Sequence, residues 1–270
     1  MDALRFVPCG AHEEKSVGWV EPRGEAHGPL VEVVNGQLIF KLKLETKVVP
    51  GAVVTRKAKE RAAQIEATTG RKPGKKETRE IKDDIRLSLM PLAFSKEATV
   101  WVWVDPQARW LVMDAGSQAK ADEVVTLLVK SLDSLNLTLI NTQVSPMAAM
   151  ADWLLTQEPS GFSVDRDCEL KAADESKAVV RYARHALDTD EVKQHVKGGK
   201  LPTRLAMTWA GRVSFMLTEG LQLKKLDFLD VVLDDIQDKG FDTDVAIATG
   251  ELRKLLPDLI EALGGEQALA

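Results

Sequence analysis

The sequence predicts an α+β fold in which antiparallel sheets carry packed helices and a helical hairpin projects from one sheet. Strand-like runs meet at tight turns, at Asn35-Gly36 and at Ala210-Gly211. Helical segments separate these strand pairs at uneven intervals, which favours an α+β arrangement over repeated βαβ units. The chain has 270 residues, of which 44% are hydrophobic and 29% charged. Such a composition is typical of a globular protein with one large core or two to three smaller ones.

Residues 30–50 are predicted to form a β-hairpin. Asn35-Gly36 supplies the two positive-φ positions of a type I′ turn. In the second strand the apolar Phe40, Leu42 and Leu44 alternate with the charged Lys41, Lys43 and Glu45. This period of two buries one face of the sheet and leaves a partly basic face open.

Two helices are predicted next, at 51–69 and 75–90, joined by the Gly- and Pro-rich stretch GRKPGKK. Each has a narrow apolar stripe, which consists of Val54, Ala58, Ala62 and Ile65 in the first helix and Ile81, Ile85 and Leu89 in the second. Stripes this narrow bury little beyond the contact between the helices. We therefore expect a projecting hairpin, hinged at Pro50 and Pro91.

The sheet is predicted to resume with strands at 98–105 and 109–114, a helix at 120–135 and a strand at 137–141. Ser145-Pro146 then opens a helix, with proline at the tolerated first helical position. Trp101 and Trp103 share one strand face, and Val100, Val102 and Val104 share the other. Core packing under a helix is expected for at least one face, and base stacking by Trp101, Trp103 and Trp110 is the alternative.

The second half is predicted to contain strands at 168–174, 178–186, 201–209 and 212–220, a short helix at 189–199 and a final helix at 243–263. The acid-rich stretch 226–238 carries Asp227, Asp230, Asp234 and Asp235 around an apolar stripe. It is interpreted as a solvated helix face, with metal binding as the alternative.

Positive charge is concentrated in one segment. The whole chain has a formal net charge of −5, but residues 56–86 contain eleven Lys and Arg against six acids, which leaves −10 for the rest. Such asymmetry indicates a local surface for a polyanion such as nucleic acid. A solvated helical hairpin with mixed charges is the alternative.

Other features exclude several classes of protein. No apolar run is long enough to span a bilayer, and the N-terminus has no secretory signal pattern. Cys9 and Cys168 are far apart and are interpreted as structural free thiols of a reducing cytoplasm. Four histidines without a Cys/His cluster make a zinc site unexpected, and no cofactor is expected.

Six ordered blocks carry a family resemblance: FVPCG, GWVEPRG, VNGQLIF, LSLMPLAFSK, DAGSQAKADEVVTLLVKSL and TGELRKLLPDLIEALGGE. Together they resemble the recombination-associated RdgC family, from about Phe6 to Glu266. The resemblance implies a horseshoe-shaped protomer of a ring-shaped homodimer that encloses double-stranded DNA. It also implies modulation of RecA-mediated recombination and replication without catalysis, in the cytoplasm and at the nucleoid.

The resemblance also assigns residues. Phe94 matches an exposed phenylalanine at the tip of the family's protomer, where Leu92 replaces an arginine, and Lys47 matches a lysine before the tip. Arg181 matches a basic family position, and Arg184 and His185 occupy a Lys-Gln pair that resembles part of the lower ring surface. Lys200 and Arg204 match two lysines near the second dimer contact. The full set of DNA-binding candidates is Lys41, Lys43, Lys47, Arg56, Lys59, Lys75, Lys76, Arg79, Lys82, Arg86, Lys96, Arg181, Arg184 and His185. The dimer candidates are Phe94, Lys200 and Arg204.

Three domains are expected: a central domain of 1–49 and 95–144, a tip domain of 50–94 and a base domain of 145–270. The family's first strand and helix precede the residue matched by Met1. Either this start is late, or a shortened relative has rebuilt that sheet edge, and an exposed edge favours strand pairing.

Two other functions compete with DNA enclosure. A regulator could bind RecA directly through Phe94 and the basic hairpin. A metal-dependent nuclease could use Asp188, Glu191 and Lys193, which distantly resemble a carboxylate–carboxylate–lysine site. The alternative is structural: residues 188–190 are suited to cap a helix, and an acid such as Glu191 is favourable in a helix's first turn. For Phe94, core packing at the start of a strand competes with exposure to a partner.

Overall fold

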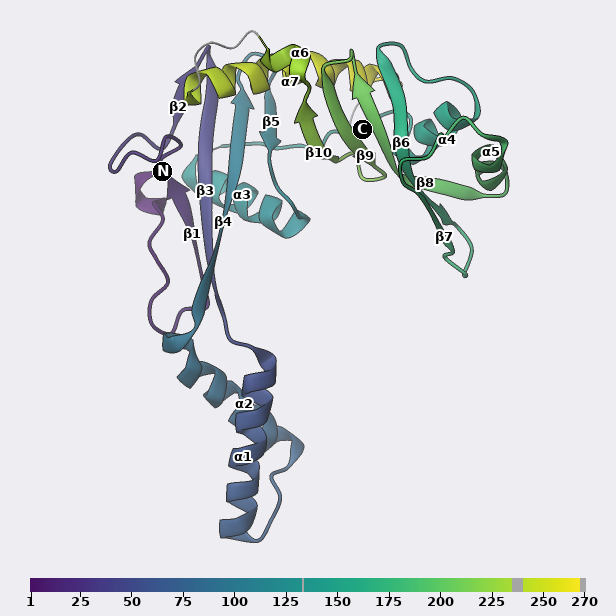
Figure 1. The fold of residues 1–270 in the computed structure, drawn as a ribbon. Helices are drawn as coiled ribbons and strands as arrows, with labels where there is room; N and C mark the ends of the chain where they lie inside the picture. Colours follow the sequence, from purple (N-terminus) through teal and green to yellow (C-terminus); the bar gives the residue numbers. More distant parts are fainter. Residues whose placement is uncertain (133, 235–239, 268–270) are drawn as a thin grey trace. The chain divides into compact units, whose positions relative to one another are not determined.

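The computed structural model describes residues 1–132, 134–234 and 240–267 (Figure 1). The chain divides into two compact units, Met1–Asn136 and Leu137–Ala270. Each unit contains one five-stranded antiparallel sheet with helices, which confirms the predicted α+β class. Among the described residues, no helix combines the length and the apolar character that crossing a membrane requires.

The first unit is built on a sheet in the order β1-β3-β4-β5, with β2 also paired to β3. A short 3-10 helix, η1 (Asp2–Leu4), precedes it. The strands are β1 (Lys15–Val20), β2 (Glu32–Val34), β3 (Gln37–Val48), β4 (Phe94–Asp105) and β5 (Trp110–Met113). Between β2 and β3, Asn35 has φ 50° and Gly36 has φ 77°, as the predicted type I′ turn requires.

Helix α3 (Gln118–Ser131) supplies the core of the first unit (Figure 1). Leu42 of β3 and Val100 and Val102 of β4 are fully buried in one cluster with Val124 and Leu128 of α3. The valine face of β4 is therefore the core face, as expected from the alternation.

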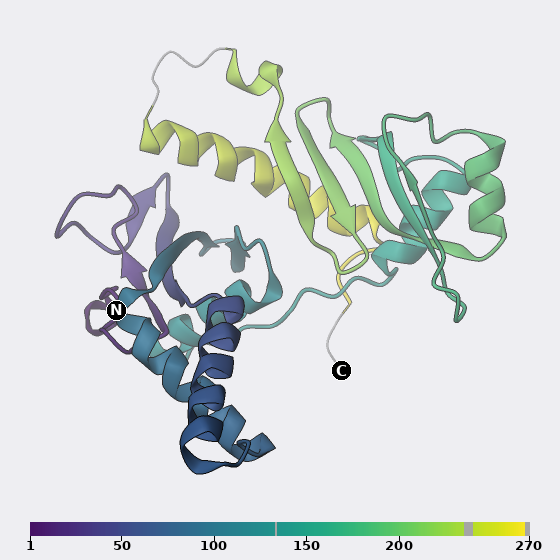
Figure 2. The same cartoon turned by 60° about the horizontal axis from the view of Figure 1, so that its bottom comes forward.

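The helical hairpin extends from the ends of β3 and β4 (Figure 1). It consists of α1 (Gly51–Thr69) and α2 (Lys75–Leu89), followed by the 3-10 helix η2 (Met90–Leu92). Figure 2 shows α1 and α2 side by side. In α1 only Val54 and Ala58 are buried, and α2 has no buried residue, so the prediction of two helices with narrow apolar contacts is confirmed.

The second unit has the sheet order β10-β9-β8-β6-β7. Its strands are β6 (Phe162–Ala172), β7 (Val179–Tyr182), β8 (Lys200–Trp209), β9 (Val213–Thr218) and β10 (Leu223–Phe228). Its helices are α4 (Pro146–Leu155), α5 (Asp190–Lys197), α6 (Asp230–Leu233) and α7 (Phe241–Ala262). The turn between β8 and β9 has positive φ at Ala210 and Gly211, as the sequence predicts.

Helices α4, α5 and α7 pack on one face of this sheet. Met150 of α4, Val192 of α5 and Leu255 of α7 are fully buried in one cluster with the β8 residues Leu205 and Met207. Two polar contacts fix α7 to the sheet. The Trp209 indole donates to Asp258 at 2.8 Å, and Arg212 makes a bidentate ion pair with Glu251 at 2.7 and 2.8 Å.

Two predicted elements are wrong. Residues 137–141 form no strand, because the neighbouring chain bonds instead to the C-terminal turn: the amides of Gln143 and Val144 donate to the carbonyls of Gly265 and Leu263. The stretch 226–238 is not one helix. Its start, with Asp227, belongs to β10, and α6 follows. Asp235 and the rest of that stretch lie outside the described residues.

Candidate nucleic-acid interface

The basic face of β3 is confirmed by the strand register, and each of its lysines has a neighbour in the protomer. Lys41, Lys43 and Lys47 pair with Trp101, Thr99 and Ser95 of β4, on the face opposite the buried Leu42–Val100 pair. The Lys41 ammonium lies 4.4 Å from the centroid of the Trp101 ring, a cation–π contact. Lys43 forms an ion pair with Glu97 at 2.9 Å. Of these three lysines, Lys43 alone has an ion pair among the described residues.

Lys96 lies on the other side of the same ladder. It pairs with Thr46, which alternates with Lys47 and shares its face with Leu44 and Leu42. Its side chain is exposed. Lys96 therefore lies on the face of the ladder opposite Lys41, Lys43 and Lys47.

A buried carboxylate attaches the N-terminal segment to this face. Glu45 is 7% exposed and accepts hydrogen bonds from the Cys9 amide at 2.8 Å and from the Ser95 hydroxyl. The hydroxyl of Ser95, followed by the Cys9 amide, lowers the pKa of Glu45. Lys47 donates to the Gly10 and Ala11 carbonyls at 2.6 and 3.1 Å. Lys47, a DNA-binding candidate, therefore also holds the loop at 9–11 on β3.

Several cations of the hairpin are paired within it. Arg71 pairs with Glu77 at 2.8 Å and Lys72 with Glu66 at 3.7 Å. Arg56 pairs with Glu60 and Lys76 with Glu80, each at 3.9 Å and four residues apart. Such exposed pairs contribute about 0.2–1 kcal/mol each and reduce the charge that the hairpin offers to an anion.

Other hairpin cations are exposed and have no carboxylate within 4.0 Å in the part of the chain that the structure describes. These are Lys57, Lys59, Arg61, Lys75, Arg79, Lys82 and Arg86. Five of the seven, all except Lys57 and Arg61, belong to the DNA-binding candidates. They are the largest group of uncompensated cations among those candidates.

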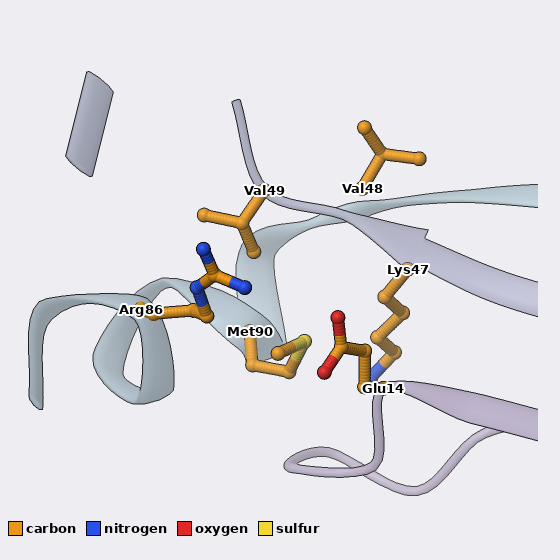
Figure 3. A pocket seen from close by; sticks show the side chains of 6 residues that line it. All are labelled: Glu14, Lys47, Val48, Val49, Arg86 and Met90. Atoms are coloured by element: carbon orange, nitrogen blue, oxygen red, sulfur yellow. The ribbon is translucent and has the colours of Figure 1, made fainter. Parts of the chain in front are cut away.

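A pocket of about 220 Å³ lies where β3, α2 and η2 meet. Figure 3 shows Arg86 and Met90 on one side and Glu14 and Lys47 on the other. Val48 and Val49 complete its wall. Arg86, which is exposed on α2, therefore lines the same pocket as Lys47 at the end of β3.

Phe94 is not a core residue of the protomer. Its side chain is 87% exposed, and the adjacent Leu92 is 80% exposed. Of the two interpretations of this stretch, core packing is wrong. Contact with a partner remains a prediction.

In the second unit, the predicted basic positions are partly compensated. Arg181 of β7 forms an ion pair with Glu169 of β6 at 2.6 Å, and this hydrogen bond is the main cause of the lowered pKa of Glu169. The Arg184 amide donates to Asp167 at 2.7 Å while its side chain is exposed. His185 places Nδ1 2.6 Å from the Ala186 carbonyl and its ring beside Tyr182.

Lys200 and Arg204 lie on opposite faces of β8. The register shifts between Glu169, which pairs with Arg204, and Leu170, which pairs with Pro202, so Thr203 is an extra residue. The Lys200 amine consequently lies 3.0 Å from His195 of α5, on the core side, while Arg204 is exposed on the open face. A partner that packs on one face of β8 can therefore contact the side chain of Lys200 or that of Arg204, but not both.

The tryptophans of β4 differ from each other. Trp103 is 6% exposed and donates to Gln37 at 2.7 Å, whereas Trp101 is half-buried beneath Lys41. Trp110 is half-buried in β5. A buried indole cannot stack on a base, which removes Trp103 from the base-stacking alternative.

The residues of the nuclease alternative lie at the start of α5. The Thr189 hydroxyl accepts from the Val192 amide and caps the helix, and Glu191 accepts from the Tyr182 hydroxyl at 3.1 Å. Lys193 is on the same helix. No group of three or more His, Cys, Asp and Glu with metal-binding geometry occurs within the described ranges.

Sequence reasoning missed Glu45 and its loop. No local pattern connects position 9 with position 45, because their contact depends on the path of the N-terminal segment across β3. The only available signal was a carboxylate between Lys43 and Lys47 on a strand face.

Comparison with known proteins gives one consistent family. A family model described as "Putative exonuclease, RdgC" matches residues 1–266. A protein of Herminiimonas arsenicoxydans named recombination-associated protein RdgC is 48% identical over 270 residues, which cover 97% of this chain and 89% of the relative. Proteins of the same name from Janthinobacterium sp. and Dechloromonas aromatica are 47% and 46% identical, over 97% of this chain and 89% and 88% of theirs.

Proposed function

The chain belongs to the RdgC family of recombination-associated proteins, and we propose that it binds double-stranded DNA without sequence specificity as a ring-shaped homodimer. In this proposal it modulates RecA-mediated homologous recombination and replication by occupying DNA. It acts in the cytoplasm, associated with the nucleoid, and it is not an enzyme.

The observation that carries the proposal is the charge of the projecting hairpin. Residues 56–86 hold eleven Lys and Arg against six acids, and seven of these cations are exposed without an acidic partner among the described residues. Duplex DNA carries about one negative charge per 1.7 Å of its axis, and cations that contact phosphates release condensed counterions. This binding is independent of base sequence and sensitive to salt.

The rest of the chain favours the same interpretation. It carries a formal charge of −10 outside residues 56–86. An acidic exterior repels DNA from other surfaces and concentrates attraction at the basic hairpin. A net charge of −5 is therefore compatible with a DNA-binding protein.

The homodimer is supported by the exposed apolar end of β4. Phe94 and Leu92 are 87% and 80% exposed at the junction of the hairpin with the sheet. Large apolar side chains at such exposure are typical of an interface. Arg204 on the open face of β8 is the candidate for a second contact, and Lys200 lies on the opposite face of this central strand.

A non-catalytic role is proposed in spite of the description of the family model. Glu191 and Lys193 lie on a helix, and the Glu191 carboxylate is engaged by Tyr182. Incubation of supercoiled and linear DNA with Mg²⁺ and the protein should produce no strand scission. Cleavage that disappears in Glu191→Ala would establish the nuclease instead.

The main experiment measures duplex binding across sequences and salt concentrations, together with the solution mass. Random duplexes should bind within a few-fold of each other, and affinity should fall steeply as salt rises. One site bound on the order of a thousandfold more tightly would indicate base readout and refute the proposal. A mass of one protomer under binding conditions would refute the homodimer.

Direct binding to RecA is the alternative for the same surface. RecA activity on DNA should be inhibited only at protein concentrations that occupy the DNA. Retention of the protein on immobilised RecA without DNA would favour the alternative.

A further inference from the structure

Four of the hairpin cations form a straight line on α2. Lys75, Arg79, Lys82 and Arg86 follow one another at spacings of four, three and four residues. At 100° per residue they lie within about 60° of one another around the helix. At a rise of about 1.5 Å per residue the line is about 16 Å long. All four side chains are exposed.

The line is not neutralised by the acids of its own helix. Glu77 pairs with Arg71 and Glu80 with Lys76, and both lie away from the line. Asp84 is on the far side of the helix. Asp83 lies beside Arg79 and Arg86 but forms no ion pair within 4.0 Å among the described residues. Within the described ranges, none of the four cations has a carboxylate within 4.0 Å.

The arrangement also opposes helix stability. Each cation of the line has another at three or four residues along the helix, and like charges at these spacings destabilise a helix. Asp83, four residues after Arg79 and three before Arg86, offsets part of this repulsion. An anionic ligand along the line would relieve the rest.

Helix α1 offers no such line, although it has four cations. Arg56 pairs with Glu60, and Arg61 donates to Gln64 at 3.1 Å. Lys57, Lys59 and Arg61 have no carboxylate within 4.0 Å among the described residues. Lys57 and Arg61, four residues apart, share one side of the helix, whereas Lys59 lies on the other side. A single extended ligand can therefore contact at most two of these cations, against four on α2.

We propose that α2 holds one phosphodiester backbone along Lys75, Arg79, Lys82 and Arg86, and that α1 makes no phosphate contact. One DNA strand rises about 3.4 Å per phosphate along the axis while it winds around that axis, so the line is long enough to follow a few successive phosphates. The Arg86 end leads to the pocket that Lys47 also lines. The inference rests on the proposed binding of DNA and names the helix face that performs it. Arg56 and Lys59, both DNA-binding candidates from the sequence, are excluded by it.

The test compares two variants that lose the same charge. The line variant is Lys75→Gln, Arg79→Gln, Lys82→Gln and Arg86→Gln. The control is Arg56→Gln, Lys57→Gln, Lys59→Gln and Arg61→Gln on α1. For a random duplex, the slope of log K against log salt should decrease by about 3–4 in the line variant, at about 0.9 per lost contact. The control should change it by less than about 1.

Circular dichroism and thermal melting distinguish loss of contact from loss of fold. The line variant should melt at the wild-type temperature or above it, because like-charge neighbours are removed. If the line variant unfolds, the double variant Arg79→Gln, Lys82→Gln replaces it, with an expected slope change of about 2.

Each other outcome overturns the inference. An equal decrease of the salt slope in both variants would mean that the charge of the whole hairpin attracts DNA without a preferred helix face, and the proposed function would stand. Unchanged slopes in both would place the DNA on another surface. Failure of the wild-type protein to bind duplex DNA would refute the proposed function itself.

Discussion

Phe94 lies directly opposite Val48 at the outer end of the β3–β4 ladder, and both side chains are exposed, at 87% and 48%. This apolar pair lies where the strands pass into the helical hairpin. Nothing in the described protomer buries it.

Replacement of Phe94 by alanine should change binding and leave folding intact. An exposed side chain contributes little to folding, whereas a phenylalanine at the centre of an interface can contribute about 2 kcal/mol or more. We expect Phe94→Ala to keep the wild-type melting temperature, to weaken stable loading on DNA and to remove competition with RecA. Thermal melting beside a gel-shift assay measures both effects.

Phe40→Ala is the matched control for this prediction. Phe40 is on β3 of the same sheet but is 4% exposed. Truncation of a buried phenylalanine costs about 3–5 kcal/mol of folding free energy. A Phe94→Ala protein that melts as early as Phe40→Ala would contradict the assignment.

The Glu45 carboxylate should make the first unit sensitive to acid. Hydrogen bonds from the Ser95 hydroxyl and the Cys9 amide lower its pKa in the folded state. Its stabilisation is therefore present above the ordinary glutamate pKa of about 4.3 and is lost as the pH falls through the folded value. The difference in melting temperature between wild type and Glu45→Gln should narrow over that acidic range. Ser95→Ala should reduce the same difference, and a difference independent of pH would exclude this role.

Gly18 is required by a close backbone approach. A Cβ atom at this position would lie 2.4 Å from the N and Cα atoms of Phe6, whose amide donates to the Trp19 carbonyl at 2.9 Å. Gly18→Ala must displace the N-terminal segment, and such overpacking typically costs about 1–3 kcal/mol. Denaturant unfolding should show this loss. Gly116→Ala, where a Cβ atom would meet nothing within 4 Å, should have almost no effect.

The two thiols should differ in reactivity. Burial raises the pKa of Cys168 to about 12, and its side chain is 4% exposed. Burial, followed by the charge of Glu45, also raises the pKa of Cys9, but this thiol is only half-buried. Only the thiolate is nucleophilic, so a disulfide reagent at pH 8 should label Cys9 slowly and alone in the native protein, and both thiols after unfolding. The variant Cys9→Ser should then show no native labelling. Rapid labelling of Cys168 in that variant would be inconsistent with the buried core around β6.

The sequence predicts elements best where local chemistry decides them. Asn35-Gly36 and Ala210-Gly211 both adopt the positive φ values expected of their turns, and Gly70 ends α1 in the left-handed conformation. The helical hairpin follows from the same punctuation. These features depend on a few neighbouring residues, and no tertiary contact overrides them.

The predictions fail where contacts with residues distant in the sequence determine the local structure. Residues 137–141 have the composition of a strand, yet the residues that follow bond to the C-terminal turn and leave no strand beside them. The position of Lys200 could not be inferred from its spacing to Arg204. Four residues along a regular strand return to the same face, but the extra residue Thr203 reverses it. Of the candidate site, its charge could be predicted, but not which cations are paired.

The β3–β4 ladder has a mechanical consequence. Eleven residue pairs run in continuous register from Leu38 and Val104 to Val48 and Phe94. Hydrogen bonds of an antiparallel pair lie perpendicular to the strands. A pull on the outer end of β4 along its own axis therefore shears these bonds together instead of opening them one by one. The ribbon resists tension in that direction and yields more easily to peeling from its edge.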